Sequence, residues 1–115
     1  MTTDDQNQKI EQLQNIEQGI QTLNAQKQQL SSRILEIDSA LNELKNTDDS
    51  YKIIGNVMVK AKASSLSKEL SDKRKHTEIR INAIEKQESS LKQKAQTIQK
   101  EVMENMQKNE KSKGE

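Results

Sequence analysis

The sequence contains no cysteine, no proline, no tryptophan and no phenylalanine, and these absences limit the structures that the chain can form. Without cysteine there is neither a disulfide framework nor a thiolate nucleophile. Without proline, helices can continue for many turns. Tyr51 is the single aromatic residue, and hydrophobic residues make up only 30% of the 115, so a sizeable closed core is not expected. The composition leaves two interpretations open, an elongated helical assembly of one domain or a disordered chain.

Side chains suited to catalysis are equally scarce. His76 is the only histidine, and its neighbours Lys73, Arg74 and Lys75 indicate a charged, solvated helix face. The three glycines are far apart, so the sequence holds no phosphate-binding loop. No cluster of metal ligands stands out, and the acidic residues have the spacing of a helix surface. The sequence therefore predicts a protein that is not an enzyme and has no metal and no cofactor.

Targeting signals are missing as well. The N-terminal segment MTTDDQNQKI is acidic and polar where a signal peptide requires a positive flank and an apolar run. No stretch approaches the roughly 20 apolar residues of a membrane span. We therefore expect a cytoplasmic protein without a membrane partner.

Charge is balanced overall but divided between the two halves of the chain. Residues 1–50 carry nine acidic and four basic residues, a net charge of −5, while residues 51–115 carry nine acidic and fifteen basic residues, a net charge of +6. Opposite halves of opposite sign favour folding back on each other. Nucleic acid is not an expected partner, because the basic residues alternate with glutamates and, apart from Tyr51, no aromatic residues are available to stack on bases.

Heptad repeats predict two long helices, over residues 9–45 and 66–106, with a polar tail over 107–115. The first helix has a seam in which nine of ten positions are apolar: Leu13, Ile16, Ile20, Leu23, Lys27, Leu30, Ile34, Ile37, Leu41 and Leu44. In the second seam seven of ten are apolar: Leu70, Arg74, Thr77, Ile81, Ile84, Glu88, Leu91, Ala95, Ile98 and Val102. Folding the chain at Gly55-Asn56 makes facing residue numbers sum to about 111, and both seams stay in phase. This agreement favours an antiparallel coiled coil over disorder.

Two charged residues interrupt the predicted seams one layer apart. Lys27 falls opposite Ile84, and Glu88 falls opposite Leu23. Either the two side chains form an ion pair across the helices that fixes their register, or each extends its charged group to water.

The bend between the helices carries a β-hairpin signal. Residues 46–50, NTDDS, stop the first helix, and the β-branched run YKIIGNVMVK follows over 51–60. Gly55-Asn56 divides this run equally and suits a two-residue turn, which places Ile54 opposite Val57 and Ile53 opposite Met58. A second short connection is expected over residues 61–65. Because an isolated hairpin is marginal in water, we expect its apolar residues to pair with other subunits. These assembly residues are Tyr51, Ile53, Ile54, Gly55, Asn56, Val57, Met58 and Val59.

A second group of apolar residues lies at the helix ends far from the hairpin in sequence. Its members are Ile10, Leu13, Ile16, Val102, Met103 and Met106. Three of them belong to the seams, but Met103 and Met106 do not. Methionine is flexible and polarizable, which suits contact with many different apolar surfaces. We therefore expect this group to bind non-native proteins.

The hairpin run YKIIGNVMVK, with AQKQQLSSRILEIDSALNEL before it and RINAIEKQESSLKQKAQTIQKEV after it, resembles the prefoldin β-subunit family of archaeal type over residues 10–106. The resemblance implies a chaperone that works without ATP. It also implies that the chain is part of a heterohexamer of two α and four β subunits, whose hairpins build β-barrels. Its partners would be a prefoldin α subunit, other β subunits, unfolded proteins held between the coiled-coil ends, and a group II chaperonin. A coiled-coil scaffold or dimerisation protein is the alternative, which the hairpin disfavours because a helical hairpin needs only a short loop.

Overall fold

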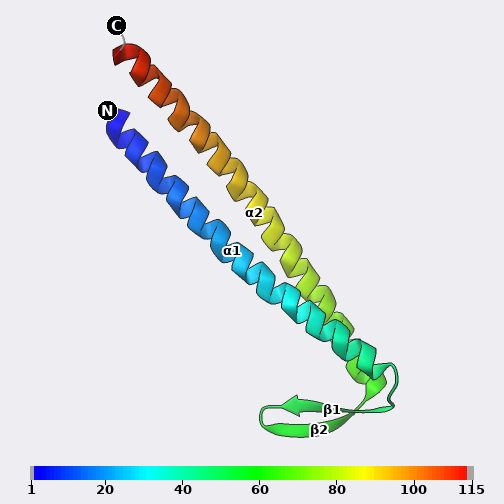
Figure 1. Cartoon of the computed structure of the whole chain (residues 1–115). Coiled ribbons are helices and arrows are strands. Elements are labelled where there is room, and N and C mark those ends of the chain that lie inside the picture. The colour runs from blue at the N-terminus through cyan, green and yellow to red at the C-terminus, as the bar shows by residue number, and fades with distance from the viewer. Residues whose placement is uncertain (1, 114–115) are drawn as a thin grey trace. The chain divides into compact units, whose positions relative to one another are not determined.

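The computed structural model describes residues 2–113, with side chains described for residues 4–108. Helix α1 (Thr2–Leu44) leads to strands β1 (Asp49–Ile54) and β2 (Val57–Lys62), and helix α2 (Ala63–Lys113) follows (Figure 1). The two strands form one antiparallel sheet. The chain divides into two compact units, which we call the hairpin unit (Lys27–Ala83) and the terminal unit (Met1–Gln26 with Ile84–Glu115).

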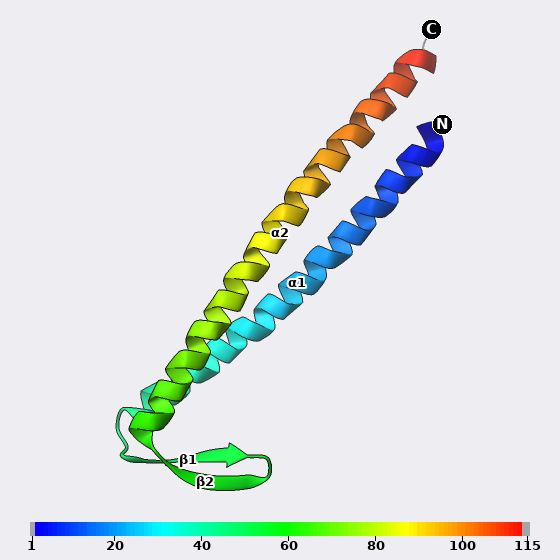
Figure 2. The ribbon, with the colours of Figure 1, turned by 180° about the vertical axis from the view of Figure 1, so that it is seen from behind.

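In each unit α1 and α2 run side by side in opposite directions (Figures 1 and 2). All twenty predicted seam positions are buried or half-buried, which confirms the two heptad lines. In the hairpin unit, Leu30 and Ile37 are the most buried apolar residues of α1. In the terminal unit, Ile84 of α2 is the most buried apolar residue. The core is therefore a narrow strip between two helices, as the low content of large apolar residues requires.

Two cross-helix ion pairs support the predicted antiparallel register. Lys9 Nζ lies 3.4 Å from Glu101 Oε2 in the terminal unit, and these residue numbers sum to 110. Arg74 Nε lies 2.6 Å from Asp38 Oδ1 in the hairpin unit, and these numbers sum to 112. Both sums lie next to the value of 111 expected from a turn at Gly55-Asn56.

Both helices are longer than the sequence predicted. Helix α1 begins at Thr2 rather than residue 9, because no helix breaker stands in its polar first turns and Asp4 and Asp5 complement the positive end of the helix dipole. Helix α2 continues to Lys113, so most of the tail predicted over residues 107–115 is helical. Gly114 is the first helix-breaking residue after Gly55, and residues 114 and 115 lie outside the described part of the chain.

The connection predicted over residues 61–65 is wrong. Strand β2 continues to Lys62, and α2 starts at Ala63 without a loop. The strands extend because Ser50 pairs with Ala61 and its hydroxyl donates a 2.8 Å hydrogen bond to the Ala61 carbonyl oxygen. Ala63 is buried, and its N–H donates to the Asp48 carbonyl oxygen at 3.3 Å, which closes the base of the hairpin.

The turn and the register of the hairpin are as predicted. Ile54 faces Val57, and Ile53 faces Met58. Gly55 has a φ of +62°, whereas no other residue of the described chain has a positive φ. A left-handed residue at the first central position alone is typical of a type II′ turn, which matches the right-handed twist of a hairpin.

Candidate functional site

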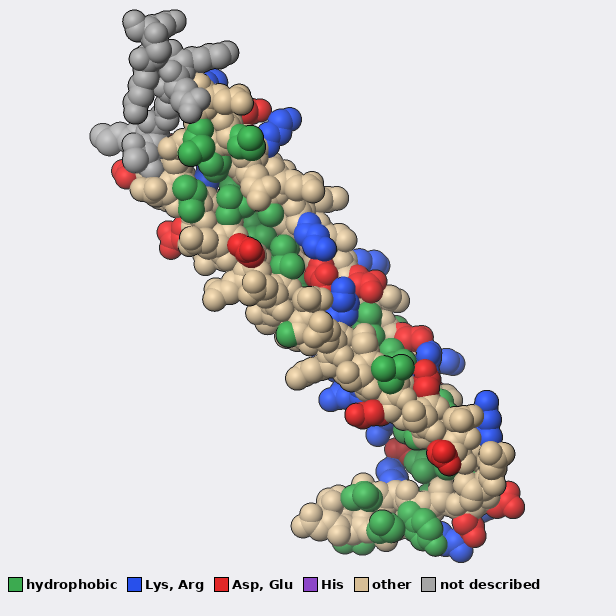
Figure 3. Space-filling view, viewed as in Figure 1, with side chains coloured by type: hydrophobic (Ala, Val, Ile, Leu, Met, Phe, Trp, Pro, Cys, Tyr) green, Lys and Arg blue, Asp and Glu red, His purple; other side chains and the backbone are tan. Residues whose placement is uncertain are grey.

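The hairpin presents apolar side chains on both of its faces. Tyr51, Ile53 and Met58 lie on one face, and Ile54, Val57 and Val59 lie on the other, because neighbouring residues of a strand point to opposite sides. All six are exposed, from 44% for Val59 to 69% for Ile53. Figure 3 shows apolar side chains gathered on this hairpin. A surface of this kind on a small hairpin is typical of a contact with another protein.

Both outer edges of the hairpin are also open to further strands. The sheet has only two strands, so each pairs along one edge and leaves the other edge's N–H and C=O groups without a strand partner in the described chain. Such edges are templates for strand addition. The sequence-predicted assembly residues, including the turn residues Gly55 and Asn56, thus lie together on one exposed element that offers backbone hydrogen bonds and apolar area.

The hairpin is attached to the helices by a salt bridge. Lys52 Nζ donates a 2.6 Å hydrogen bond to Glu69 Oε1 on α2. The hydrogen bond from Lys52 holds the pKa of the Glu69 carboxyl below its ordinary value, against the opposing effect of burial. Figures 1 and 2 show the strands running across the end of the helix pair rather than along it. The salt bridge helps to hold the hairpin in this crosswise position.

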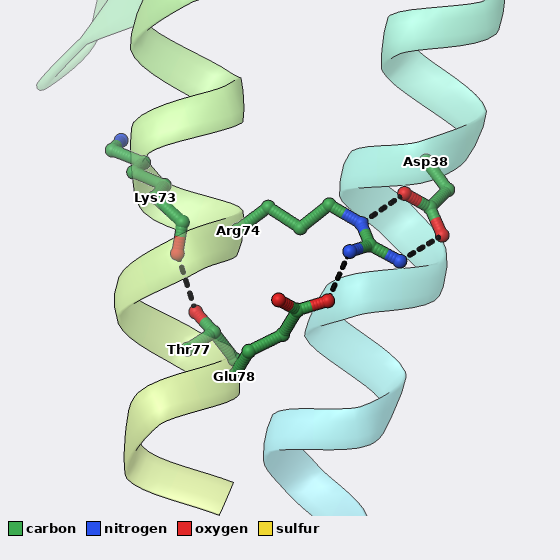
Figure 4. A network of polar contacts seen from close by, with 5 residues as sticks. All are labelled: Asp38, Lys73, Arg74, Thr77 and Glu78. Atoms are coloured by element: carbon green, nitrogen blue, oxygen red, sulfur yellow. Dashed lines mark hydrogen bonds and ion pairs between the residues drawn. The ribbon is translucent and has the colours of Figure 1, made fainter.

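A second polar network joins α1 to α2 in the hairpin unit (Figure 4). The Arg74 guanidinium donates from Nε and Nη2 to the two carboxylate oxygens of Asp38, at 2.6 and 3.3 Å, and its Nη1 donates to Glu78. The hydrogen bond from Arg74 lowers the pKa of the Asp38 carboxyl, and the same contact raises the pKa of Arg74. Paired donors on a carboxylate constrain geometry as well as distance, so this network fixes the helix register beside the hairpin.

The helix ends of the terminal unit hold the second predicted site. Ile10, Met103 and Met106 are exposed, at 42%, 62% and 54%. Leu13, Ile16 and Val102 are half-buried in the seam. The six residues are therefore divided into an exposed set and a set that supports the helix pair. In Figure 3 apolar side chains also gather along the described end of this unit.

The polar seam residues are less exposed than a solvated surface requires. Glu88 is only 7% exposed, and Lys27 is half-buried. The proposed coupling between these two residues stays a prediction. Thr77 is 7% exposed and satisfies its hydroxyl by donating to the Lys73 carbonyl oxygen at 2.8 Å, so it fits the seam without a partner on α1.

Sequence reasoning missed several exposed or paired residues. Leu35 and Ile79, on the helices of the hairpin unit, are 68% and 64% exposed. Both lie off the seam lines, and this position was the signal that they would be exposed. The Asp38–Arg74 pair could have been found from the same facing-residue rule that predicted the seams.

Within residues 2–113 no helix combines the length and apolar character that a membrane crossing requires. Among the same residues, no group of three or more histidine, cysteine, aspartate or glutamate side chains is placed to hold a metal ion.

Comparison with known proteins gives consistent results. A family model described as "Prefoldin subunit" matches residues 7–109. The prefoldin subunit beta of Archaeoglobus fulgidus is 37% identical over 95 residues, covering 79% of this chain and 82% of that protein. The prefoldin subunit beta of Methanospirillum hungatei is 38% identical over 96 residues, covering 81% of this chain and 80% of that protein.

A solved structure is also similar to this chain. The crystal structure of the prefoldin beta subunit from Thermococcus strain KS-1 matches with a TM-score of 0.80 and 28% sequence identity. The match covers 87% of this chain and 90% of that one.

Proposed function

Because this chain belongs to the prefoldin β-subunit family, a family of non-enzymatic chaperone subunits, we propose that it joins a heterohexamer with a prefoldin α subunit and other β subunits. In this complex it holds non-native proteins without ATP and passes them to a group II chaperonin. The observation that carries the proposal is the exposed hairpin, whose apolar faces and open edges have no use in the isolated chain.

The hairpin supplies the assembly contact by adding strands at its edges. Strand addition satisfies the free backbone groups, and it brings apolar side chains such as Ile53 or Val57 into contact with the hairpins of neighbouring subunits. Repeated around a ring, this pairing closes the hairpins into an inter-subunit β-barrel, which leaves no open edge.

Non-native proteins are held at the helix ends of the terminal unit. Met103, Met106 and Ile10 present apolar area there at exposures of 42–62%. Their side chains can adapt to many different apolar segments, which a chaperone without sequence preference needs. Leu13, Ile16 and Val102 are half-buried in the seam, where they keep the helix ends paired and add the remaining apolar area.

The assembly role is tested by replacing Ile53 and Val57 with Lys. We expect I53K/V57K to keep its helix content, because neither residue lies in the seam, but to form monomers or small oligomers when co-expressed with an α subunit. Native mass spectrometry measures the mass of the complex.

The matched control is L35K/I79K, which adds the same two charges at equally exposed apolar positions on the helices of the hairpin unit. This control should assemble fully. A full-size I53K/V57K complex would refute the assembly role, and a wild-type chain that forms only dimers would favour the coiled-coil scaffold instead.

A further inference from the structure

A groove of about 420 Å³ lies between α1 and α2 in the hairpin unit. Its apolar floor includes Ile37 and Leu70, and its cationic rim includes Arg33, Lys73 and Arg80. His76 adds a ring that can donate a hydrogen bond. None of its lining residues belongs to the apolar hairpin or to the group of apolar residues at the helix ends.

The cations of this groove lie along one side, or flank, of the seam between the two helices. No acidic residue lines the groove on that flank. Arg33, Lys73 and Arg80 each precede a seam residue (Ile34, Arg74 and Ile81), so all three belong to the same flank of the antiparallel pair. Flanking positions of a coiled coil usually carry opposite charges on the two helices. Here Arg33 of α1 lines the same groove as Lys73 and Arg80 of α2, and like charges on the two helices oppose their pairing.

On the opposite flank of the same helix pair, two acidic residues are paired with a cation. Asp38 and Glu78 each follow a seam residue, and both accept hydrogen bonds from Arg74. Figure 4 shows the Lys73 side chain pointing away from this network. The contrast is therefore local, with one flank satisfied and the other carrying excess positive charge.

The nearby acidic residues form no ion pair with the cations of the groove in the described chain. The charge of Lys73 acts on Glu69, but the Glu69 carboxylate accepts its hydrogen bond from Lys52 of the hairpin. Glu36 is one turn from Arg33 and forms no ion pair with it within 4.0 Å in the described chain. Arg33 and Arg80 likewise form no ion pair among the described residues.

We propose that this groove binds an acidic peptide segment of a partner protein, with carboxylates on Arg33, Lys73 and Arg80 and an aliphatic side chain on Ile37 and Leu70. Charge complementarity identifies the carboxylates, since their binding relieves the repulsion across the flank. The aliphatic floor favours a peptide over a nucleic acid, because a nucleic acid gains most from phosphate contacts and from aromatic residues that stack on its bases. The lining of this groove includes no phenylalanine, tyrosine or tryptophan.

The test measures binding of a fluorescein-labelled peptide, Glu-Leu-Asp-Glu-Leu-Asp, to the full-length chain in its assembled form by fluorescence anisotropy. The groove variant is Arg33→Gln with Arg80→Gln. The control is Lys86→Gln with Lys100→Gln, which removes two exposed positive charges outside the groove. The groove variant loses two solvent-screened ion pairs with the peptide, so it should bind the peptide about tenfold more weakly. The control should change the affinity less than about twofold.

Two comparison probes define the chemistry. A peptide with Gln and Asn in place of the acids and an oligomer of six Asp residues should each bind more weakly than the acidic aliphatic peptide. The groove variant should also unfold at a higher temperature than the wild type, because it lacks the repulsion between the helices. Equal loss of binding in both variants, or no binding to the wild type, would overturn the proposal. A single-stranded RNA that binds the groove more tightly than the peptide would also overturn it.

Discussion

At the scale of single residues, the conformation of Gly55 determines the hairpin turn. Its φ of +62° lies in the left-handed region, while nothing crowds the position where a Cβ would stand. The cost of a side chain there is therefore conformational. We expect Gly55→Ala to lower the free energy of unfolding by about 1–2 kcal/mol.

Thermal unfolding followed by circular dichroism, at equal protein concentration, measures this effect. Asn56→Ala is the control, because Asn56 has an ordinary negative φ and is exposed. It should change stability by less than about 0.5 kcal/mol. Equal effects of the two substitutions would contradict the role assigned to the Gly55 conformation.

The Asp38–Arg74 pair predicts how stability depends on pH. The folded-state pKa of Asp38 is lowered by its hydrogen bonds to Arg74, so the pair stabilises the fold above the unfolded-state pKa. This contribution is lost as the pH falls through the folded-state pKa. Asp38→Asn should therefore lower the melting temperature at pH 7, with the difference from wild type shrinking in acid below about pH 4.

The matched control is Asp72→Asn, since Asp72 is exposed on α2 and forms no ion pair among the described residues. Its melting temperature should follow the wild type across the pH range. A constant offset for Asp38→Asn from pH 7 to pH 3 would show that the side chain acts through packing rather than charge.

At the scale of the helices, burial and not hydrophobicity distinguishes two leucines of α1. Leu30 is 6% exposed in the seam, whereas Leu35 is 68% exposed off it. Leu30→Ala should lower the free energy of unfolding by about 2–3 kcal/mol, the lower part of the range for buried leucines, because the seam is narrow. Leu35→Ala should change it by less than about 0.5 kcal/mol. Denaturant titration compares them, and similar losses would contradict the seam assignment.

The helices and the hairpin also show which parts of the fold the sequence could predict. The heptad lines placed the seam residues correctly because helix periodicity depends only on local spacing, and Gly55-Asn56 set the hairpin register for the same reason. Helix ends were missed because residues 2–8 and 107–113 lack breakers but also lack an apolar signal. The start of α2 at Ala63 depends on hydrogen bonds across the hairpin base, which no local pattern contains.

Part of each candidate site could also be read from the sequence. The exposed hairpin residues were found because a lone hairpin cannot bury both apolar faces. The network around Arg74 and the unmatched charges of Arg33 and Arg80 were missed, because they depend on which residues meet across the two helices.

At the scale of the whole molecule, the surfaces proposed for assembly and for client holding belong to different elements. The exposed hairpin lies in the hairpin unit, and the exposed Met103 and Met106 lie in the terminal unit. A substitution in one unit should therefore leave the task of the other intact. This separation makes the holding role testable without loss of the complex.

The most direct test of the chaperone account is light scattering from an aggregating, chemically unfolded model protein in the presence of the assembled complex. The wild-type complex should suppress scattering without ATP. Met103→Ser with Met106→Ser should weaken suppression while the mass of the complex stays the same, because it removes exposed apolar area from the helix ends and leaves the hairpin unchanged. If the variant complex, at full mass, suppressed aggregation as well as the wild type does, client holding at these helix ends would be contradicted.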